Sequence, residues 1–299
     1  MKISIFTLIG NIGNTPDYWQ YAWQEALNNY LSFADEVVIV NGCDQDIAVL
    51  DRFTQDRHEK VKVINLPWPY DFHWSEIAKH FNAGLKACTG DWIMKMDIDY
   101  IIHEQDFKLL RRILEGYFKS DDVRVASFMK YTVLDRNRAY LKVPVPFIIN
   151  RHKIGKTIRF GIARDVPHNA WGYPIQVEGF DEKIGLPYGR QMIPERIKPT
   201  GIKVWNYDNF FRTKEITEEH WWRFSQARIK AGFSADWGDS KEVSLKNFAN
   251  LRNERNKKTQ QIAHKLQLTD HPAVMQERVK NMTPEIYGYN NWNNFEGLI

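Results

Sequence analysis

Strand-like and helical segments alternate over the first 120 residues, and this alternation constrains the fold more than any other feature of the sequence. Runs rich in β-branched residues predict strands at residues 2–9, 36–40, 60–65 and 92–96. Apolar residues at helical spacing predict helices at residues 15–33, 75–87 and 106–118. Strands that alternate with helices form mostly parallel sheets covered by helices on both faces. We therefore predict an α/β fold.

The rest of the chain follows a different pattern. Residues 123–150 contain two longer, partly alternating runs, which predict antiparallel strands that extend the sheet. Residues 151–205 are rich in Gly, Pro, Arg and His and are predicted to be irregular. Helices are predicted at about 215–230, 243–265 and 271–280. The sequence thus predicts a sheet domain over residues 1–212 and a helical C-terminal extension over 213–299 packed on it.

Composition argues against several classes of protein. The two cysteines, Cys43 and Cys88, form neither a disulfide framework nor a zinc motif, and the nine histidines show no H-E-x-x-H spacing. A net charge of +4 is small for a dedicated nucleic-acid-binding protein. No apolar run approaches the roughly 20 residues that cross a bilayer, and the N-terminus lacks a secretory cleavage pattern. We expect a cytoplasmic protein without a transmembrane segment.

Residues 90–100, GDWIMKMDIDY, place two carboxylates at the end of an apolar strand. Alternate residues of a strand point the same way, so Asp97 and Asp99 are predicted to share one face, with Ile98 on the other. Two unpaired carboxylates buried side by side are costly, and a bound divalent cation would neutralise them. Because D-x-D is a short and common pattern, a solvated acidic turn is the alternative.

Polar clusters follow other predicted strands at the same end. Gly10 and Asn11 come after the first strand, and residues 41–46 come after the second. In open sheets of this kind, ligands bind beyond the carboxyl ends of the strands. These clusters and the D-x-D pair are therefore predicted to meet at one ligand site.

Several segments also match the motifs of a known enzyme family in order. ISIFTLIGN stands where that family has its first strand and loop, and EVVIVNGCDQD is similar to its second strand with a D-x-x-S-x-D loop. FNAGLKACTGDWIMKMDID is similar to the run N-x-G…A-x-G-D that leads into D-x-D, and it is the most specific match. VEGFDEKI and KVWNYDNFFR are similar to the family's G-G-F-D-E and H-Y-x-x-x-R segments. Over about residues 3–212 the chain resembles the GT-A-fold glycosyltransferases of family 2.

This resemblance implies a Rossmann-like GT-A fold, in which a mixed but mostly parallel sheet is flanked by helices. It implies a transferase that moves a sugar from a nucleotide-diphosphate sugar to a hydroxyl with inversion at the sugar. The expected donor is a UDP-sugar. A hard cation, Mn²⁺ or Mg²⁺, would stabilise the departing diphosphate. The acceptor stays open among a glycan, a lipid-linked sugar, a protein and a modified nucleic-acid base.

The resemblance also implies roles for particular residues. The metal site would consist of Asp97, Asp99 and Asn206, with Asp99 as a direct ligand and Asp97 at the ribose or a metal-bound water. The nucleotide sugar would be bound by Thr7, Asn11, Asn41, Asp46, Asn82, Asp97 and Arg212. Arg212 suits bidentate pairing with the diphosphate, and a structural salt bridge is the alternative.

An inverting enzyme needs a base that takes the proton from the acceptor hydroxyl. Asp181, in the GFDEK segment, is the first candidate, and Glu182, Glu178 and Asp165 are the rivals. Trp68 and Tyr70 are placed at the wall of the donor pocket, where either could stack on the nucleotide, although core packing is favoured for Trp68.

The chain departs from the family pattern at several of these positions. Asn41 replaces a usual Asp, Cys43 replaces a usual Ser, and Asn206 replaces a His of some members. These departures keep open a relative that binds nucleotide or sugar without catalysis. A nucleotidyltransferase is a weaker alternative, because the glycines after the first strand carry no basic residue.

Overall fold

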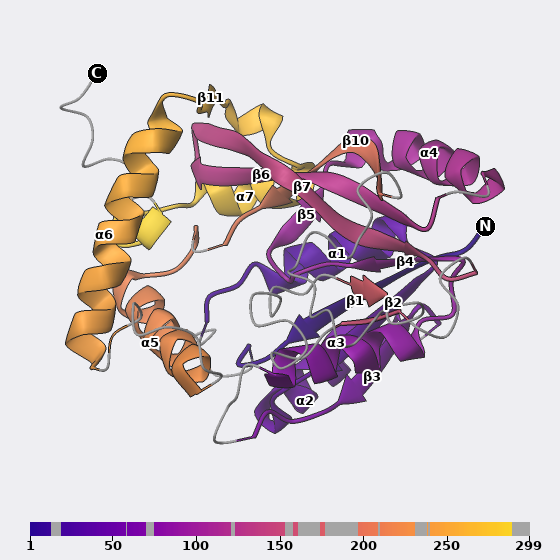
Figure 1. Ribbon diagram of the computed structural model, residues 1–299, viewed down its shortest axis with the longest axis horizontal. Coiled ribbons are helices and arrows are strands. Elements are labelled where there is room, and N and C mark those ends of the chain that lie inside the picture. Colours follow the sequence, from indigo (N-terminus) through magenta and orange to yellow (C-terminus); the bar gives the residue numbers. More distant parts are fainter. Residues whose placement is uncertain are drawn as a thin grey trace, which may run out of the picture.

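The computed structural model describes residues 1–12, 19–57, 59–69, 75–120, 123–152, 158–160, 174–176, 197–208, 210–230, 238 and 240–288. Its centre is a mixed sheet with the strand order β3-β2-β1-β4-β7-β6-β10-β5, and β11 pairs with β7 at one side (Figure 1). The α/β fold predicted from the sequence is confirmed.

The first half of the sheet is parallel and almost wholly apolar. Strands β1, β2 and β4 are buried along nearly their full length, because helices cover both of their faces. The four parallel strands are β1 (Ile3–Ile9), β2 (Glu36–Asn41), β3 (Val61–Asn65) and β4 (Trp92–Lys95). The helices that follow them are α1 (Trp23–Phe33), α2 (Ile47–Thr54), α3 (Ser75–Ala87) and α4 (Phe107–Lys119).

The second half of the sheet brings distant parts of the chain to the end of β4. Strands β6 (Val125–Asp135) and β7 (Arg138–Asn150) form an antiparallel hairpin, and β7 pairs with β4. Strand β10 (Ile197–Asn206) runs parallel to β6 and antiparallel to the short β5 (Tyr100–Ile102). The carboxyl end of β10 therefore lies beside the chain that leaves β4. A separate small sheet pairs β8 (Ile158–Phe160) with β9 (Pro174–Gln176).

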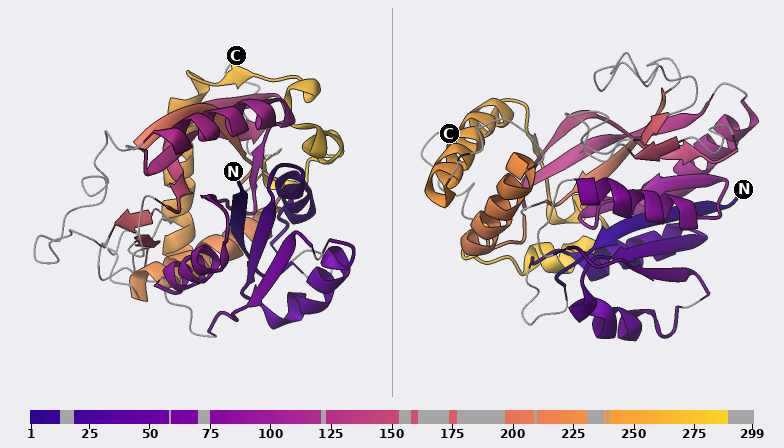
Figure 2. Two further views of the ribbon diagram at one scale, coloured as in Figure 1. Left: turned by 90° about the vertical axis from the view of Figure 1, so that its right-hand side faces the viewer. Right: turned by 60° about the horizontal axis from the view of Figure 1, so that its bottom comes forward.

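The C-terminal segments lie along the sheet domain. Helices α5 (Lys214–Lys230) and α6 (Lys241–Gln260) pack side by side at one end of the molecule (Figure 2). Strand β11 (His264–Lys265) pairs with β7, and α7 (Ala273–Lys280) packs on α1. Between them the buried His271 ring lies 2.9 Å from both the Tyr207 hydroxyl and the Arg136 carbonyl oxygen. Among the described residues, no helix combines the length and the apolar character needed to cross a membrane.

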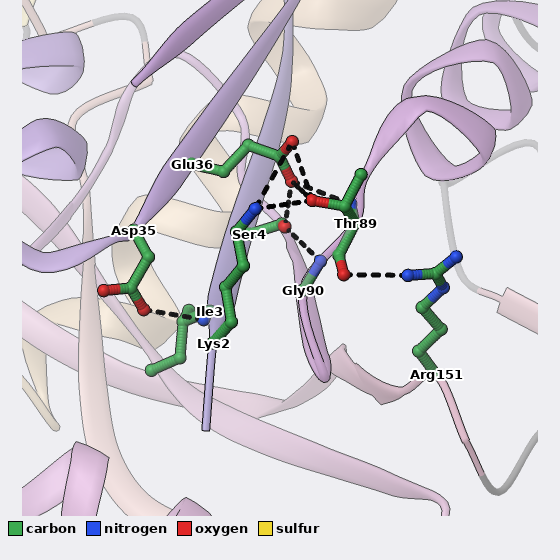
Figure 3. Close-up of polar contacts among 8 residues, drawn as sticks. All are labelled: Lys2, Ile3, Ser4, Asp35, Glu36, Thr89, Gly90 and Arg151. Atoms are coloured by element: carbon green, nitrogen blue, oxygen red, sulfur yellow. Dashed lines mark hydrogen bonds and ion pairs between the residues drawn. The ribbon is translucent and has the colours of Figure 1, made fainter. Parts of the chain in front are cut away.

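The amino ends of three strands are joined by a polar network opposite the candidate site. The Glu36 carboxylate accepts hydrogen bonds from the Ser4 hydroxyl and, at 2.7 Å, from the backbone N–H of Thr89 (Figure 3). Gly90 N–H donates to the Ser4 Oγ at 2.7 Å, and Arg151 donates to the Thr89 carbonyl oxygen at 2.8 Å. This network binds the starts of β1, β2 and β4 together.

Three sequence predictions of local structure differ from the structure, and one helix was missed. The predicted start of the first helix at residue 15 lies outside the described residues, and within them the helix begins at Trp23. The described residues just before it are tied to the C-terminal half, since Trp19 and Gln20 accept hydrogen bonds from Arg212 and Thr213. Helix α2 was not predicted. Residues 197–205 are not irregular, since they form most of β10 against β6. The helix predicted at 243–265 ends at Gln260, and His264 and Lys265 pair with β7 instead.

Helix α3 can approach β1 closely because it carries a glycine at the contact. A Cβ at Gly84 would lie 2.6 Å from Cδ2 of the fully buried Phe6. Gly116 in α4 is the matched case without a contact, since a Cβ there would meet nothing within 4 Å.

We predict opposite effects of the same substitution at these two glycines. Gly84→Ala should lower the free energy of unfolding by about 1–3 kcal/mol, the usual effect of overpacking a core. Gly116→Ala should raise it by up to about 1 kcal/mol, because alanine favours helix more than glycine does. Urea denaturation of both variants measures the difference, and a Gly84→Ala protein as stable as Gly116→Ala would contradict this packing.

Candidate active site

The D-x-D pair lies in a turn and not on a strand. Strand β4 ends at Lys95, and the Tyr100 N–H donates to the Asp97 carbonyl oxygen at 2.9 Å, which closes the turn. The predicted placement of both aspartates on one strand face is therefore wrong. The Tyr30 hydroxyl of α1 lies 2.6 Å from the Asp97 carbonyl oxygen and 2.8 Å from that of Tyr100. This contact holds the turn against the sheet.

A third carboxylate, Asp208, faces this turn from the end of β10. The Tyr207 N–H donates to the Asp99 carbonyl oxygen at 2.9 Å, so residues 206–208 lie directly beside the pair. Burial, followed by the charges of Asp208 and Asp97, raises the pKa of Asp99 to about 8. Burial is the largest influence on the pKa of Asp208 and acts to raise it, but the surrounding charges, that of Arg212 first, together outweigh burial and hold that pKa below its usual value.

Asn206, proposed from the resemblance as a metal residue, shapes the same turn. Its side chain is buried, and its Oδ1 accepts the backbone N–H of Asp208 at 2.8 Å. Sequence reasoning missed Asp208, although it lies two residues beyond Asn206 in the segment KVWNYDNFFR. Asp208 lies four residues before Arg212, and the two side chains pair at 3.4 Å. This spacing of opposite charges could have indicated Asp208 from the sequence.

A buried lysine lies under the turn. The Lys95 side chain is 2% exposed, and its Nζ is 2.7 Å from Oδ1 of Asp97. The same Nζ lies 4.6 Å from the ring centroid of Phe81 and 4.2 Å from that of Phe147. Burial lowers the pKa of Lys95, and the Asp97 carboxylate acts in the opposite direction. Sequence reasoning missed this residue because it treated WIMKM simply as an apolar strand.

The loop after β2 is held by Asn41 and Asp46, two of the residues predicted to bind the nucleotide sugar. Asn41 donates from Nδ2 to the Cys43 carbonyl oxygen at 2.8 Å and to Asn65 at 3.1 Å, and its Oδ1 accepts the Cys43 N–H at 3.1 Å. The buried Asp46 accepts the Ile12 N–H at 3.0 Å and so joins this loop to the loop after β1. Both side chains shape the loops of the site.

The remaining candidate donor-binding residues lie on nearby elements. Asn11, at the end of β1, has a φ of 59°, in the left-handed region that asparagine tolerates. Thr7 is fully buried within β1, opposite Ile39 of β2. Asn82 is half-buried on α3. The structure brings Asn11 to the loops of the site and places Thr7 in the sheet beneath them.

Trp68 packs against the loops after β1 and β2. Its backbone N–H donates to the Gly42 carbonyl oxygen at 2.8 Å. A Cβ at Gly42 would lie 1.8 Å from the indole Nε1, and a Cβ at Gly10 would lie 3.0 Å from the same atom. The His80 ring stacks on the indole with centroids 3.7 Å apart. These contacts agree with the packing role favoured for Trp68; Tyr70 lies outside the described residues.

Arg212 connects the carboxylates with the C-terminal helix α5. It is buried, donates from Nε to the Trp19 carbonyl oxygen at 2.9 Å, and lies 3.3 Å from Nδ1 of His220. Burial and then the Arg212 charge lower the pKa of His220 well below its usual value, so this ring is neutral. Because arginine can only donate, Nδ1 accepts and the ring proton is on Nε2, 3.3 Å from the Tyr21 hydroxyl. Helix α5 thus forms part of the wall of the site.

The proposed base lies outside the part of the chain that the structure describes. This applies to Asp181, Glu182 and Asp165, and also to Glu178. Their roles stay predictions.

The carboxylates have the right chemistry for a hard cation but do not form a complete cage. Within the described ranges, no three His, Cys, Asp or Glu side chains are grouped closely enough to hold a metal ion. Mg²⁺ and similar cations are commonly held by one or two carboxylates together with substrate phosphates. The buried Asp99, with its raised pKa, and the neighbouring Asp208 fit such a partial site.

The sequence was compared with known protein families. Residues 14–173, more than half of the 299, match the family model described as glycosyl transferase family 2. The chain belongs to this family. The match includes the loop after β2, helix α3 and the D-x-D turn, and it ends before β10, Asp208 and Arg212.

The chain was also compared with solved structures. Residues 1–349 of TarS from S. aureus in complex with UDP share 14% identity at a TM-score of 0.39, covering 83% of this chain and 71% of that one. Glucosyl-3-phosphoglycerate synthase from Mycobacterium tuberculosis, in complex with Mn²⁺, UDP and glucosyl-3-phosphoglycerate, shares 10% sequence identity at a TM-score of 0.40. This match covers 78% of this chain and 81% of the synthase chain. The chain spans 43% of a longer TarS structure and 51% of a mannose-6-phosphate isomerase from Helicobacter pylori. No curated protein matches the sequence.

The raised pKa of Asp99 predicts how stability depends on pH. Between pH 4 and 8 the folded state keeps a proton that the unfolded state releases, so this residue makes the protein less stable as the pH rises. Asp99→Asn removes that dependence. As the pH rises, the free energy of unfolding of the variant should therefore increase relative to that of the native protein. At pH 8 this gain should exceed about 1.4 kcal/mol, which is the equivalent of one pKa unit.

Urea denaturation at pH 4, 6 and 8 in the presence of EDTA measures this difference. Asp51→Asn, at an exposed position of α2, is the control and should follow the native protein. Parallel curves for the native protein and Asp99→Asn would contradict the raised pKa.

Proposed function

We propose that this family 2 member is a metal-assisted, inverting glycosyltransferase that uses a UDP-sugar and a hydroxyl acceptor. The single observation that supports this most is the meeting of Asp97, Asp99 and Asp208 at the carboxyl end of the sheet. Carboxylates gathered there suit a cation and a nucleotide diphosphate. The complexes of TarS with UDP and of the synthase with Mn²⁺ and UDP are consistent with this donor.

The donor would lie across the loops after β1, β2 and β4. Asn11 and the loop shaped by Asn41 and Asp46 would hold the nucleoside, and Asn82 and Thr7 would support the donor pocket. Asp97 would reach the ribose. Arg212 already pairs with Asp208, and its guanidinium would pair with the diphosphate as well.

The cation would be held by Asp99 and Asp208, with the Asn206 carbonyl oxygen nearby and phosphate oxygens completing its shell. When bound, it would neutralise the charge that develops on the departing diphosphate. The protein's own contribution is to keep Asp99 buried and to position both carboxylates, through Tyr30 and the end of β10.

On the acceptor side, Asp181 would take the proton from the attacking hydroxyl, with Glu182, Glu178 and Asp165 as the other candidates. Direct attack by that hydroxyl inverts the configuration at the sugar. The acceptor class is open among a glycan, a lipid-linked sugar, a protein and a modified nucleic-acid base.

A second candidate function is nucleotide or sugar binding without catalysis. The observation that favours it is Asn41, whose side-chain NH₂ donates to Cys43 and Asn65 and whose Oδ1 accepts the Cys43 N–H within the protein. Turnover separates the two functions, since only an enzyme consumes the donor. A nucleotidyltransferase would instead release diphosphate from a nucleoside triphosphate.

We expect UDP-sugars with Mn²⁺ to raise the melting temperature of the protein, because a ligand bound by the folded state alone stabilises it. A thermal-shift screen of nucleotide sugars with and without Mn²⁺ tests this. Asp99→Ala should keep the fold and lose the combined shift, whereas Asp51→Ala should retain it. An Asp99→Ala protein with native affinity for UDP and Mn²⁺ in calorimetry would show that the site is misassigned.

We also expect Asp181→Asn to lower the rate of transfer by about a hundredfold or more, the usual scale for loss of a general base. The amide keeps the shape of the side chain but does not accept the proton. Donor affinity should stay near the native value in the same variant. If transfer proceeds at the native rate, Glu182→Gln, Glu178→Gln and Asp165→Asn identify which carboxylate acts.

A further inference from the structure

Lys95 is a buried cation that the proposed reaction does not use. It lies at the end of β4, two residues before Asp97, and its side chain is 2% exposed. Its surroundings include the rings of Phe81 and Phe147 and the Asp97 carboxylate at 2.7 Å. A lysine is rarely buried to this degree without a partner, so the pair with Asp97 accounts for its presence there.

The pair is asymmetric with respect to solvent. The Asp97 side chain is 36% exposed, while that of Lys95 is almost fully covered. Lys95 therefore binds Asp97 from the protein interior and leaves the other side of the carboxylate accessible. A ligand that approaches Asp97 meets a carboxylate whose charge is already neutralised from below.

This neutralisation weakens the attraction of the turn for a cation alone. A cation held by Asp99 and Asp208 would gain little attraction from Asp97, because the Lys95 Nζ lies 2.7 Å from Oδ1 of Asp97. The charge of this cation and that of the Lys95 ammonium repel each other, and the burial of Lys95 limits the screening of this repulsion by salt. Lys130 and Arg212 add positive charge near Asp99. The described residues accordingly contain no ready-made metal cage.

We propose that Lys95 is a built-in counter-cation for Asp97, so that the site takes up a divalent cation only together with a nucleotide diphosphate. The diphosphate supplies the negative charge that the Lys95–Asp97 pair has removed, and its oxygens complete the coordination shell. This inference rests on the proposed nucleotide-sugar donor. It predicts that Mn²⁺ and nucleotide each strengthen binding of the other by the same factor, as linkage requires.

Calorimetric titration of the native protein with Mn²⁺ alone, UDP alone with EDTA, and both together measures this coupling. We expect Mn²⁺ to bind at least tenfold more tightly in the presence of UDP. In Lys95→Met, whose apolar side chain suits the Phe81 and Phe147 rings, Mn²⁺ alone should bind at least tenfold more tightly than to the native protein. The factor by which UDP strengthens Mn²⁺ binding should therefore be smaller in Lys95→Met than in the native protein.

Two further variants serve as controls. Lys79→Met removes an exposed lysine from α3 and should leave Mn²⁺ binding unchanged. The double variant Lys95→Met/Asp97→Asn replaces the ion pair with a neutral pair and should lose the gain of Lys95→Met, because the effect acts through the Asp97 charge. Circular dichroism checks that each variant is folded, and the native titrations stand even if Lys95→Met does not fold.

Two outcomes would overturn the inference. One is native protein that binds Mn²⁺ alone as tightly as with UDP, and the other is folded Lys95→Met with unchanged Mn²⁺ affinity. Failure of the proposed function has a different signature, which is native protein that binds no nucleotide diphosphate at all. The comparison of Mn²⁺ alone between native protein and Lys95→Met then still decides the role of Lys95.

Discussion

The free-energy cost of burying carboxylates at the carboxyl end of β4 governs the arrangement of the candidate site. Asp99 is almost fully buried beside Asp97 and Asp208, and its pKa is raised to about 8. The structure limits this cost with cations placed around the group, namely Lys95 below Asp97 and Arg212 beside Asp208. Burial and like charges nearby disfavour the ionised form of a carboxyl group, and neighbouring cations reduce that cost.

Sheet topology brings these charges together from distant parts of the chain. The β6–β7 hairpin inserts β7 beside β4, and β10 then runs back so that its end pairs with β5. Asp208 and Arg212, more than 100 residues after the D-x-D turn, reach it only through this order of strands. The D-x-D turn itself is closed by one backbone hydrogen bond and held by the Tyr30 hydroxyl.

The C-terminal helices add to the same end of the molecule. Through His220, helix α5 contacts Arg212 and Tyr21, and α7 packs on α1 with Arg278 3.3 Å from Glu25. The segment before α1 is shaped by these contacts, because Trp19 and Gln20 accept hydrogen bonds from Arg212 and Thr213. The wall of the site is therefore built from both ends of the chain.

The sequence by itself determined the apolar strands β1, β2 and β4, helix α3 and the hairpin of β6 and β7, because their patterns of apolar residues follow local periodicity. It also pointed to Asp97 and Asp99 as a pair. Only the tertiary structure decided that they lie in a turn, that Asp208 joins them and that Lys95 neutralises Asp97. These features depend on burial and on contacts between residues far apart in the chain. No local pattern encodes such contacts, since a lysine in an apolar strand or an aspartate after a strand has the same sequence signature wherever its partner lies.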